Sequence, residues 1–155
     1  MAEGVPAPGK AELDRAGWCG LAHLNPSDAP IFILQGEHDF GSAATAVATK
    51  ISDSAPCNGS VIAAFFTLTE AKTGGTGDDD TCISTDSGAS TKLTGEVELD
   101  MSDTVYKNAL GSVVGVAPSA TPTFSKGDDI YAYTNAQTTR GAGKYNVVIV
   151  CKKTS

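Results

Sequence analysis

Short apolar stretches separated by turn-forming residues recur from Ile31 to the end of the chain. The strongest of them, Val61–Thr69, contains no charged residue and follows the turn-forming segment Asn58-Gly59-Ser60. A run of this length and composition is typical of a central β-strand that is covered on at least one face. The pattern therefore predicts β-structure over this part of the chain.

The other apolar stretches are shorter, and several alternate between apolar and polar residues. In Leu93–Leu99, for example, the apolar residues fall on one face and two glutamates on the other. The spacing is typical of a β-sandwich or jelly roll and not of alternating strands and helices. We expect a single all-β, jelly-roll-like sandwich domain over residues 31–155. Besides Val61–Thr69, the expected strands are Ile31–Leu34, Ala43–Ile51, Thr81–Ser84, Leu93–Leu99, Val113–Val116, Ile130–Thr134 and Asn146–Cys151.

Residues 1–30 lack this periodicity, and we interpret them as an irregular N-terminal arm. Prolines and glycines interrupt the arm, and Trp18, the one tryptophan of the chain, lies among glycines. A large aromatic side chain in such a segment needs a surface against which it can be buried. Two interpretations stay open: the arm folds back on its own domain, or it packs on a neighbouring subunit. For the second, the candidate anchors are Val5, Leu13, Trp18, Leu21 and Leu24.

The charge of the chain argues against some classes of partner. The net charge is −7, and the sequence contains no basic cluster. Binding to nucleic acid or to an anionic membrane relies on such a cluster, so we expect neither as a partner. No apolar run approaches the roughly 18 residues that span a bilayer. The N-terminus also lacks a basic segment followed by an apolar one, so we expect synthesis in a cytoplasm without ordinary secretion.

The four cysteines, Cys19, Cys57, Cys82 and Cys151, lie far apart in the sequence. No pair has the C-x-x-C spacing of zinc knuckles or thioredoxin-like sites. In a reducing cytoplasm we expect free thiols, most of them buried as small apolar side chains. A disulfide stays open as an alternative if the assembled protein meets an oxidising exterior, and the sequence does not choose among the pairings.

Candidate catalytic groups are few, because the chain contains only two histidines, His23 and His38. In Glu37-His38-Asp39, neighbouring side chains of a strand point to opposite faces, so the three do not converge. We expect His38 to be exposed or to have its hydrogen bonds satisfied in the core. Cys19 and His23 would share one face of a helix, but nearby glycines disfavour that helix. We therefore expect no enzyme and no cofactor, with a hydrolase built on scattered carboxylates as an alternative.

An acidic loop is the one candidate metal site. Gly74-Gly75-Thr76-Gly77-Asp78-Asp79 begins like a calcium-binding repeat, and carboxylates and turn carbonyls are ligands that Ca²⁺ prefers. Such repeats bind calcium when several stack, and here there is one. We expect a solvated loop; if a metal binds, its ligands are Asp78, Asp79 and Asp80.

Four segments carry a resemblance to a protein family. They are Ala55–Ala64, Thr69–Gly77, Phe124–Ile130 and Val147–Val150. The stretch from Ala55 to Lys152 resembles capsid decoration (cement) proteins of tailed bacteriophages. The resemblance implies a jelly-roll-like domain, often a trimer, made in the host cytoplasm and bound to the outside of the virion. Its partner would be the major capsid protein, whose subunits it would bridge, with the arm reaching onto that protein or a sister subunit.

A carbohydrate-binding module is the alternative function. β-Sandwiches host many sugar-binding sites, and Tyr131, Tyr133 or Trp18 would stack on a sugar ring. Calcium held by the acidic loop would assist such binding. Tyr131 and Tyr133 fall on one face of their strand, where burial in the core is an equal expectation.

Overall fold

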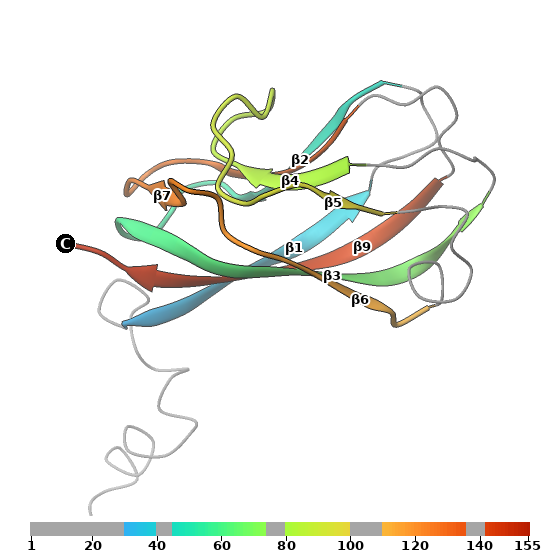
Figure 1. Ribbon diagram of the computed structural model, residues 1–155, viewed down its shortest axis with the longest axis horizontal. Helices are drawn as coiled ribbons and strands as arrows, with labels where there is room; N and C mark the ends of the chain where they lie inside the picture. The colour runs from blue at the N-terminus through green and yellow to red at the C-terminus, as the bar shows by residue number, and fades with distance from the viewer. Residues whose placement is uncertain (1–29, 40–44, 74–79, 100–109, 136–141) are drawn as a thin grey trace, which may run out of the picture.

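The computed structural model describes residues 30–39, 45–73, 80–99, 110–135 and 142–155. Within these ranges the chain contains no helix and forms two antiparallel β-sheets that pack face to face (Figure 1). The predicted all-β sandwich is therefore confirmed. Residues 1–29 of the predicted arm lie outside the described residues. No described segment forms a helix long and apolar enough to cross a membrane.

The five-stranded sheet has the order β1-β9-β3-β6, with the short strand β7 also paired to β3. The four-stranded sheet has the order β2-β8-β4-β5. Apart from β4 and β5, neighbours in both sheets are not consecutive along the chain, as expected for a sandwich. The strands are β1 (Ile31–Asp39), β2 (Val47–Ser52), β3 (Gly59–Thr73), β4 (Asp80–Ser84), β5 (Val97–Glu98), β6 (Val113–Val116), β7 (Thr123–Phe124), β8 (Ile130–Thr134) and β9 (Ala142–Lys153).

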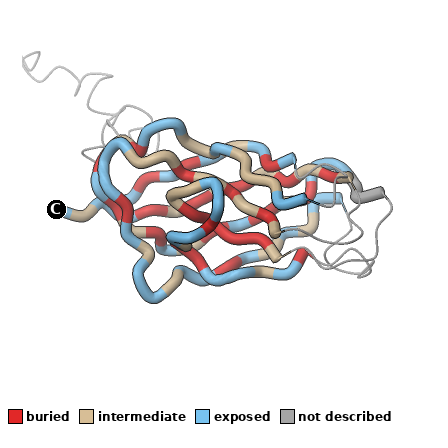
Figure 2. The backbone as a smooth tube through the Cα atoms, turned by 90° about the horizontal axis from the view of Figure 1, so that it is seen from above, coloured by how far each residue is buried: buried red, intermediate tan, exposed pale blue. Residues whose placement is uncertain are grey.

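The two longest strands, β3 and β9, pair along the middle of the five-stranded sheet, from Gly59 opposite Lys153 to Thr73 opposite Ala142. Strand β9 alternates between buried and half-buried residues over most of its length. This period of two sends one set of side chains into the sandwich and the other set to the outer face of the sheet. The core consequently lies between the sheets, and buried and more exposed positions alternate along the strands (Figure 2).

Aromatic side chains fill the space between the sheets. Phe66 of β3 meets Tyr145 of β9 edge-to-face, with ring centroids 6.4 Å apart. Phe32 of β1 meets Phe124 of β7 in the same way at 6.2 Å. Such perpendicular contacts add to the free energy that burial of the rings contributes.

His38 connects the two sheets through buried hydrogen bonds. Its side chain is fully buried, and its Nδ1 and Nε2 atoms lie 2.8 Å from Thr49 Oγ1 and 2.7 Å from Thr134 Oγ1. The Thr134 hydroxyl lies in turn 2.9 Å from the hydroxyl of Thr81. Thus β1 of one sheet is bonded to β2 and β8 of the other. Of the two expectations for His38, exposure or burial with satisfied hydrogen bonds, the structure shows the second.

Some predicted strand boundaries are wrong. Only Val97–Glu98 of the predicted strand Leu93–Leu99 is a strand, because Leu93 N instead donates to the carbonyl of Ile83 across a loop. Leu93 and Leu99 are nevertheless fully buried, as the alternation predicted. Strand β1 runs five residues past Leu34, to Asp39. Strand β7 was missed, because two residues carry no periodicity.

The predicted turn Asn58-Gly59-Ser60 is also corrected, since Gly59 and Ser60 are the first residues of β3. A Cβ at Gly59 would lie 2.4 Å from Cζ of Phe124, a buried ring held by Phe32. The glycine is needed because the aromatic ring takes the place of a side chain.

We predict that Gly59→Ala lowers the free energy of unfolding by about 1–3 kcal/mol, the usual cost of overpacking a filled site. Gly95→Ala is the matched control, since the nearest atom to its Cβ would be the Ala117 carbonyl oxygen at 3.9 Å. Urea denaturation of the two variants measures the difference. Equal stabilities would show that the Phe124 ring moves aside at little cost.

Candidate functional site

Apolar side chains cross the outer face of the five-stranded sheet. On β1, Ile31 and Ile33 are 45% and 60% exposed, while their neighbours Phe32 and Leu34 point into the core. Ile33 pairs with Val150 of β9, and Val150 pairs with Ala63 of β3. The outward side chains of three adjacent strands are therefore in contact across the sheet.

The same surface continues to the far edge of the sheet. Phe65 of β3, 39% exposed, pairs with Val148 of β9 and with Gly115 of β6. A Cβ at Gly115 would lie 3.4 Å from the Phe65 ring, so the ring spreads over the glycine. Val113 lies two residues before Gly115 in β6 and is therefore on the same face of the sheet. We call this surface the apolar row; it consists of Ile31, Ile33, Ile62, Phe65, Val113, Val148 and Val150.

A β-bulge in β3 shapes the apolar row. The register with β9 shifts between Val61 and Ala63, which leaves Ile62 without a partner in the ladder. Val61 and Ala64 are both buried, although they are three residues apart, and Ile62 and Phe65 are both exposed. One extra residue in a strand reverses the faces that follow it. The bulge thereby places two large apolar side chains outside.

The other half of the same outer face is polar. Lys144 Nζ of β9 lies 3.8 Å from Glu37 of β1 and 3.4 Å from Glu70 of β3. The charge of Glu37 and the hydrogen bond and charge of Glu70 raise the pKa of Lys144. Between the halves, Gln35 donates to Asn146 at 3.1 Å. The face is thus divided along the strands into an apolar half and a charged half.

The outer face of the four-stranded sheet carries two tyrosines. Ile130, Ala132 and Thr134 of β8 are buried, whereas Tyr131 and Tyr133 are half-buried on the opposite face. This decides the question left open by the sequence: the tyrosines point away from the core. Lys50 Nζ lies 5.7 Å from the centre of the Tyr131 ring and 2.9 Å from Asp129. Hydrogen bonds to Asp129 and Asp53 raise the pKa of Lys50.

The predicted arm and metal sites fall largely outside the described residues. Val5, Leu13, Trp18, Leu21 and Leu24 lie there, as do Asp78 and Asp79. Asp80, the first residue of β4, accepts a hydrogen bond from the Asn135 side chain at 3.1 Å. No group of three or more His, Cys, Asp or Glu side chains in the described ranges is placed to hold a metal ion. The calcium site therefore stays a prediction.

The described cysteines, Cys57, Cys82 and Cys151, are buried, as expected, and no disulfide joins any two of them. Burial raises the pKa of Cys82 to about 11. Burial, with a smaller effect of Cys57, raises that of Cys151 to about 12. Thiols with such pKa values stay protonated at neutral pH and are poor nucleophiles.

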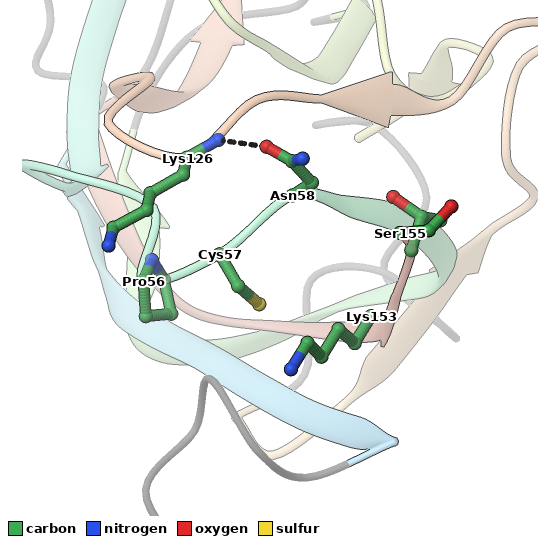
Figure 3. Close-up of a pocket in the computed structure, with 7 residues that line it drawn as sticks. Pro56, Cys57, Asn58, Lys126, Lys153 and Ser155 are labelled. Atoms are coloured by element: carbon green, nitrogen blue, oxygen red, sulfur yellow. Dashed lines mark hydrogen bonds between the residues drawn. The ribbon is translucent and has the colours of Figure 1, made fainter.

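Cys57 also lines an open cavity of about 310 Å³ near the ends of β3 and β9. Lys126 and Lys153 lie around it, and the backbone N–H of Lys126 donates to Asn58 Oδ1 at 2.8 Å (Figure 3). The lining residues include no His, Asp or Glu side chain. The ionisable side chains that line the cavity are Cys57, Lys126 and Lys153.

A turn after β4 is organised around one carboxylate. Asp86 accepts hydrogen bonds from the backbone N–H groups of Gly88, Ser90 and Thr91 at 2.8–3.0 Å. Its second oxygen also accepts from the Ser90 hydroxyl at 2.9 Å. Desolvation acts to raise the pKa of Asp86, but the hydrogen bonds outweigh it and lower the pKa to about 2. The loop is thus held by an ionised side chain.

The comparisons with known proteins give no family. No protein-family model matches the chain, and no curated protein matches it. Among solved structures, the chain is similar to one described as "Bacillus endospore appendages form a novel family of disulfide-linked pili". The sequence identity is 17%, the TM-score is 0.31, and the match covers 80% of this chain and 89% of the other. A TM-score this low supports no conclusion about fold or function.

We predict that Asp86→Ala is less stable than the unsubstituted protein at neutral pH and that the difference shrinks in acid. The folded-state pKa lies below the value near 3.9 of an unfolded aspartate, so the stabilisation is present above about pH 4 and is lost as the pH falls toward 2. At neutral pH the loss is roughly 0.5–2 kcal/mol, as for other carboxylates that cap backbone N–H groups.

Urea denaturation of both proteins between pH 7 and pH 2 measures this difference. Asp53→Ala is the control, because Asp53 is largely exposed and makes one surface ion pair with Lys50. A difference in stability that stayed constant over this pH range would contradict the assignment to the ionised Asp86.

Proposed function

We propose that the protein is a non-catalytic structural subunit that binds the outside of a phage capsid and stabilises it by bridging capsid subunits. The apolar row is the observation that supports binding to another protein. Monomeric proteins rarely expose contiguous apolar patches larger than a few hundred Å², and contacts with other proteins are among the main reasons for such patches. The other parts of the proposal rest on the resemblance to capsid decoration proteins. These parts are the location on the outside of the virion and the major capsid protein as partner.

The chemistry of the described residues favours binding over catalysis. His38, the one described histidine, is fully buried, and both of its ring nitrogens are hydrogen-bonded to threonine hydroxyls. A substrate in solvent has no path to it. The described cysteines are buried, and the pKa values of Cys82 and Cys151 keep those thiols protonated. These groups support the fold, and the exposed outer faces are what other molecules meet.

A trimer on the shell surface fits this role. Three copies that each present the same small contact bind far more tightly than one, because the second and third contacts form within an already tethered complex. The polar half of the face, with Glu37, Lys144 and Glu70, would then stay in solvent at the rim of the contact.

The test is binding of the purified protein to capsids that lack it, measured by co-sedimentation. We predict saturation at a fixed copy number relative to the major capsid protein. Ile33→Glu is predicted to reduce the affinity at least about tenfold, because it places a charge in the centre of the contact. Ser87→Glu adds the same charge on an exposed loop of the other sheet and is predicted to bind normally. Undiminished binding of Ile33→Glu would remove the apolar row from this function.

A carbohydrate-binding role is the second candidate, and the outward position of Tyr131 and Tyr133 is what favours it. Aromatic rings on a sheet surface stack on the apolar faces of sugars. A glycan array with and without a chelator separates the two functions. The capsid proposal predicts signals at background level, whereas binding that is lost in Tyr133→Ala would establish the sugar-binding role. Loss of binding in chelator would add the acidic loop to the site.

A further inference from the structure

We infer that the apolar row is the docking site for the N-terminal arm, residues 1–29, of a second copy of this chain. The inference rests on the part of the proposed function that makes this face a contact with protein, and it assigns that contact to a sister subunit. Ile33→Glu would then weaken capsid binding by breaking up the trimer, whose three contacts bind more tightly than one. It rests on where the arm joins the domain, on the side chains and charge of the arm, and on the position of the row.

The arm joins the domain at the first residue of the row. Pro30 accepts a hydrogen bond from Lys153 N at 2.9 Å, so the chain is already in register with β9 when it reaches Ile31. Ile31 is also the outermost exposed residue of the row on β1. Each arm therefore leaves its own domain at the end of β1 that the apolar row also reaches.

The arm is long enough to reach a neighbour. At about 3.3 Å per residue, 29 extended residues span about 95 Å. This is more than twice the diameter of about 35 Å expected for a compact domain of roughly 125 residues. The arm can thus leave its own domain and cross the complete face of the next one.

The side chains and charges of the arm suit the row. Its apolar residues are spread along its length: Val5, Leu13, Trp18, Leu21 and Leu24. The arm has four acidic residues (Glu3, Glu12, Asp14, Asp28) and two basic ones (Lys10, Arg15), a net charge of 2 − 4 = −2. Lys152, exposed and paired with Ile31, places a positive charge at one end of the row. Apolar contacts would supply the affinity, and this charge would favour one position of the arm.

The direction of the row favours a second copy over the arm's own domain. The row crosses the strands from β1 to β6, whereas the chain enters β1 along the strand direction. To reach its own row, the arm would have to reverse its direction before it enters β1. Prolines at positions 26 and 30 restrict that segment, because each fixes its own φ and biases the preceding residue to extended conformations. Exchange of arms from copy to copy avoids the reversal.

Arm exchange also closes into a ring. Each copy donates its arm to the next copy and receives one on its row, which is a heterologous, head-to-tail contact. If the rotation between copies is about one third of a turn, three such contacts close a trimer, the state that the resemblance implies.

The test uses two full-length variants with complementary defects and no capsid. Trp18→Ser combined with Leu21→Ser weakens the arm and leaves the row intact; Phe65→Glu damages the row and leaves the arm intact. Light scattering after size-exclusion chromatography gives the masses, and circular dichroism checks that each variant is folded. We expect a trimer for the unsubstituted chain and for Ser87→Glu, monomers for each defective variant alone, and a 1:1 complex when the two are mixed.

Trp18 fluorescence follows the arm itself. We expect its emission to shift to shorter wavelength as the unsubstituted chain associates, and not in Phe65→Glu. A monomer whose Trp18 emission is already shifted at every concentration, and is changed by Phe65→Glu, would show docking on the arm's own domain and overturn the inference. Absence of a complex in the mixture, or a trimer that persists in Phe65→Glu and in Ile33→Glu, would also overturn it.

Because no capsid is present, these outcomes are independent of the capsid-binding assay. Trimers that fail to bind capsids would refute the proposed function and leave the arm exchange standing. Monomers that bind capsids through the row would refute the arm exchange and leave the proposed function standing.

Discussion

The antiparallel ladder between β3 and β9 is the constraint on which the rest of the structure depends. These two strands form the middle of the larger sheet, and every other strand of that sheet attaches to one of them. Their period of two decides which side chains enter the core and which face outward. Tyr145, Val147 and Ile149 fill the sandwich, while Val148 and Val150 lie on the outside. A shift of one residue would exchange these sets. The register between β3 and β9 therefore determines which side chains form the core and which form the apolar row.

A second interaction joins the two sheets. The imidazole of His38 bonds with hydroxyls on β2 and β8, so that the buried polar groups satisfy one another. Removal of one partner would leave a buried ring nitrogen or hydroxyl with one hydrogen bond fewer, and the loss of a buried hydrogen bond typically costs about 1–3 kcal/mol. The residue that looks most like a catalytic group in the sequence is therefore a structural connection. Its burial also explains why chemistry is not expected at Glu37-His38-Asp39, since the flanking carboxylates lie on the opposite face of β1.

The sequence was sufficient for the architecture, because alternation and turn residues are local signals. Val61–Thr69 and Ile130–Thr134 lie within observed strands, and Leu93 and Leu99 are buried as predicted. Features that depend on distant partners were missed. Gly59 belongs to a strand because the Phe124 ring, far along the chain, occupies the space that a side chain would take. Strand β7 exists only through its pairing with β3.

The apolar row was missed for the same reason. Ile31–Leu34 is apolar throughout, so its composition does not reveal that one half of it faces outward. The bulge at Ile62 depends on the register with β9 and has no local signature. In the sequence, the apolar residues of the arm stand out instead, because they do not belong to an alternating pattern. The structure adds a surface of matching apolar character in the sheet that the arm precedes, and this surface is the docking site that we propose for the arm.

The central claim is that the apolar row is covered by protein in the assembled molecule. Hydroxyl-radical footprinting of the unsubstituted protein, at concentrations above and below its association, measures the exposure of individual side chains. The account predicts that oxidation of Ile33 and Phe65 falls several-fold on association, while that of Tyr131 on the other sheet is unchanged. Equal oxidation of Ile33 and Phe65 in both states, in a protein that does associate, would contradict it.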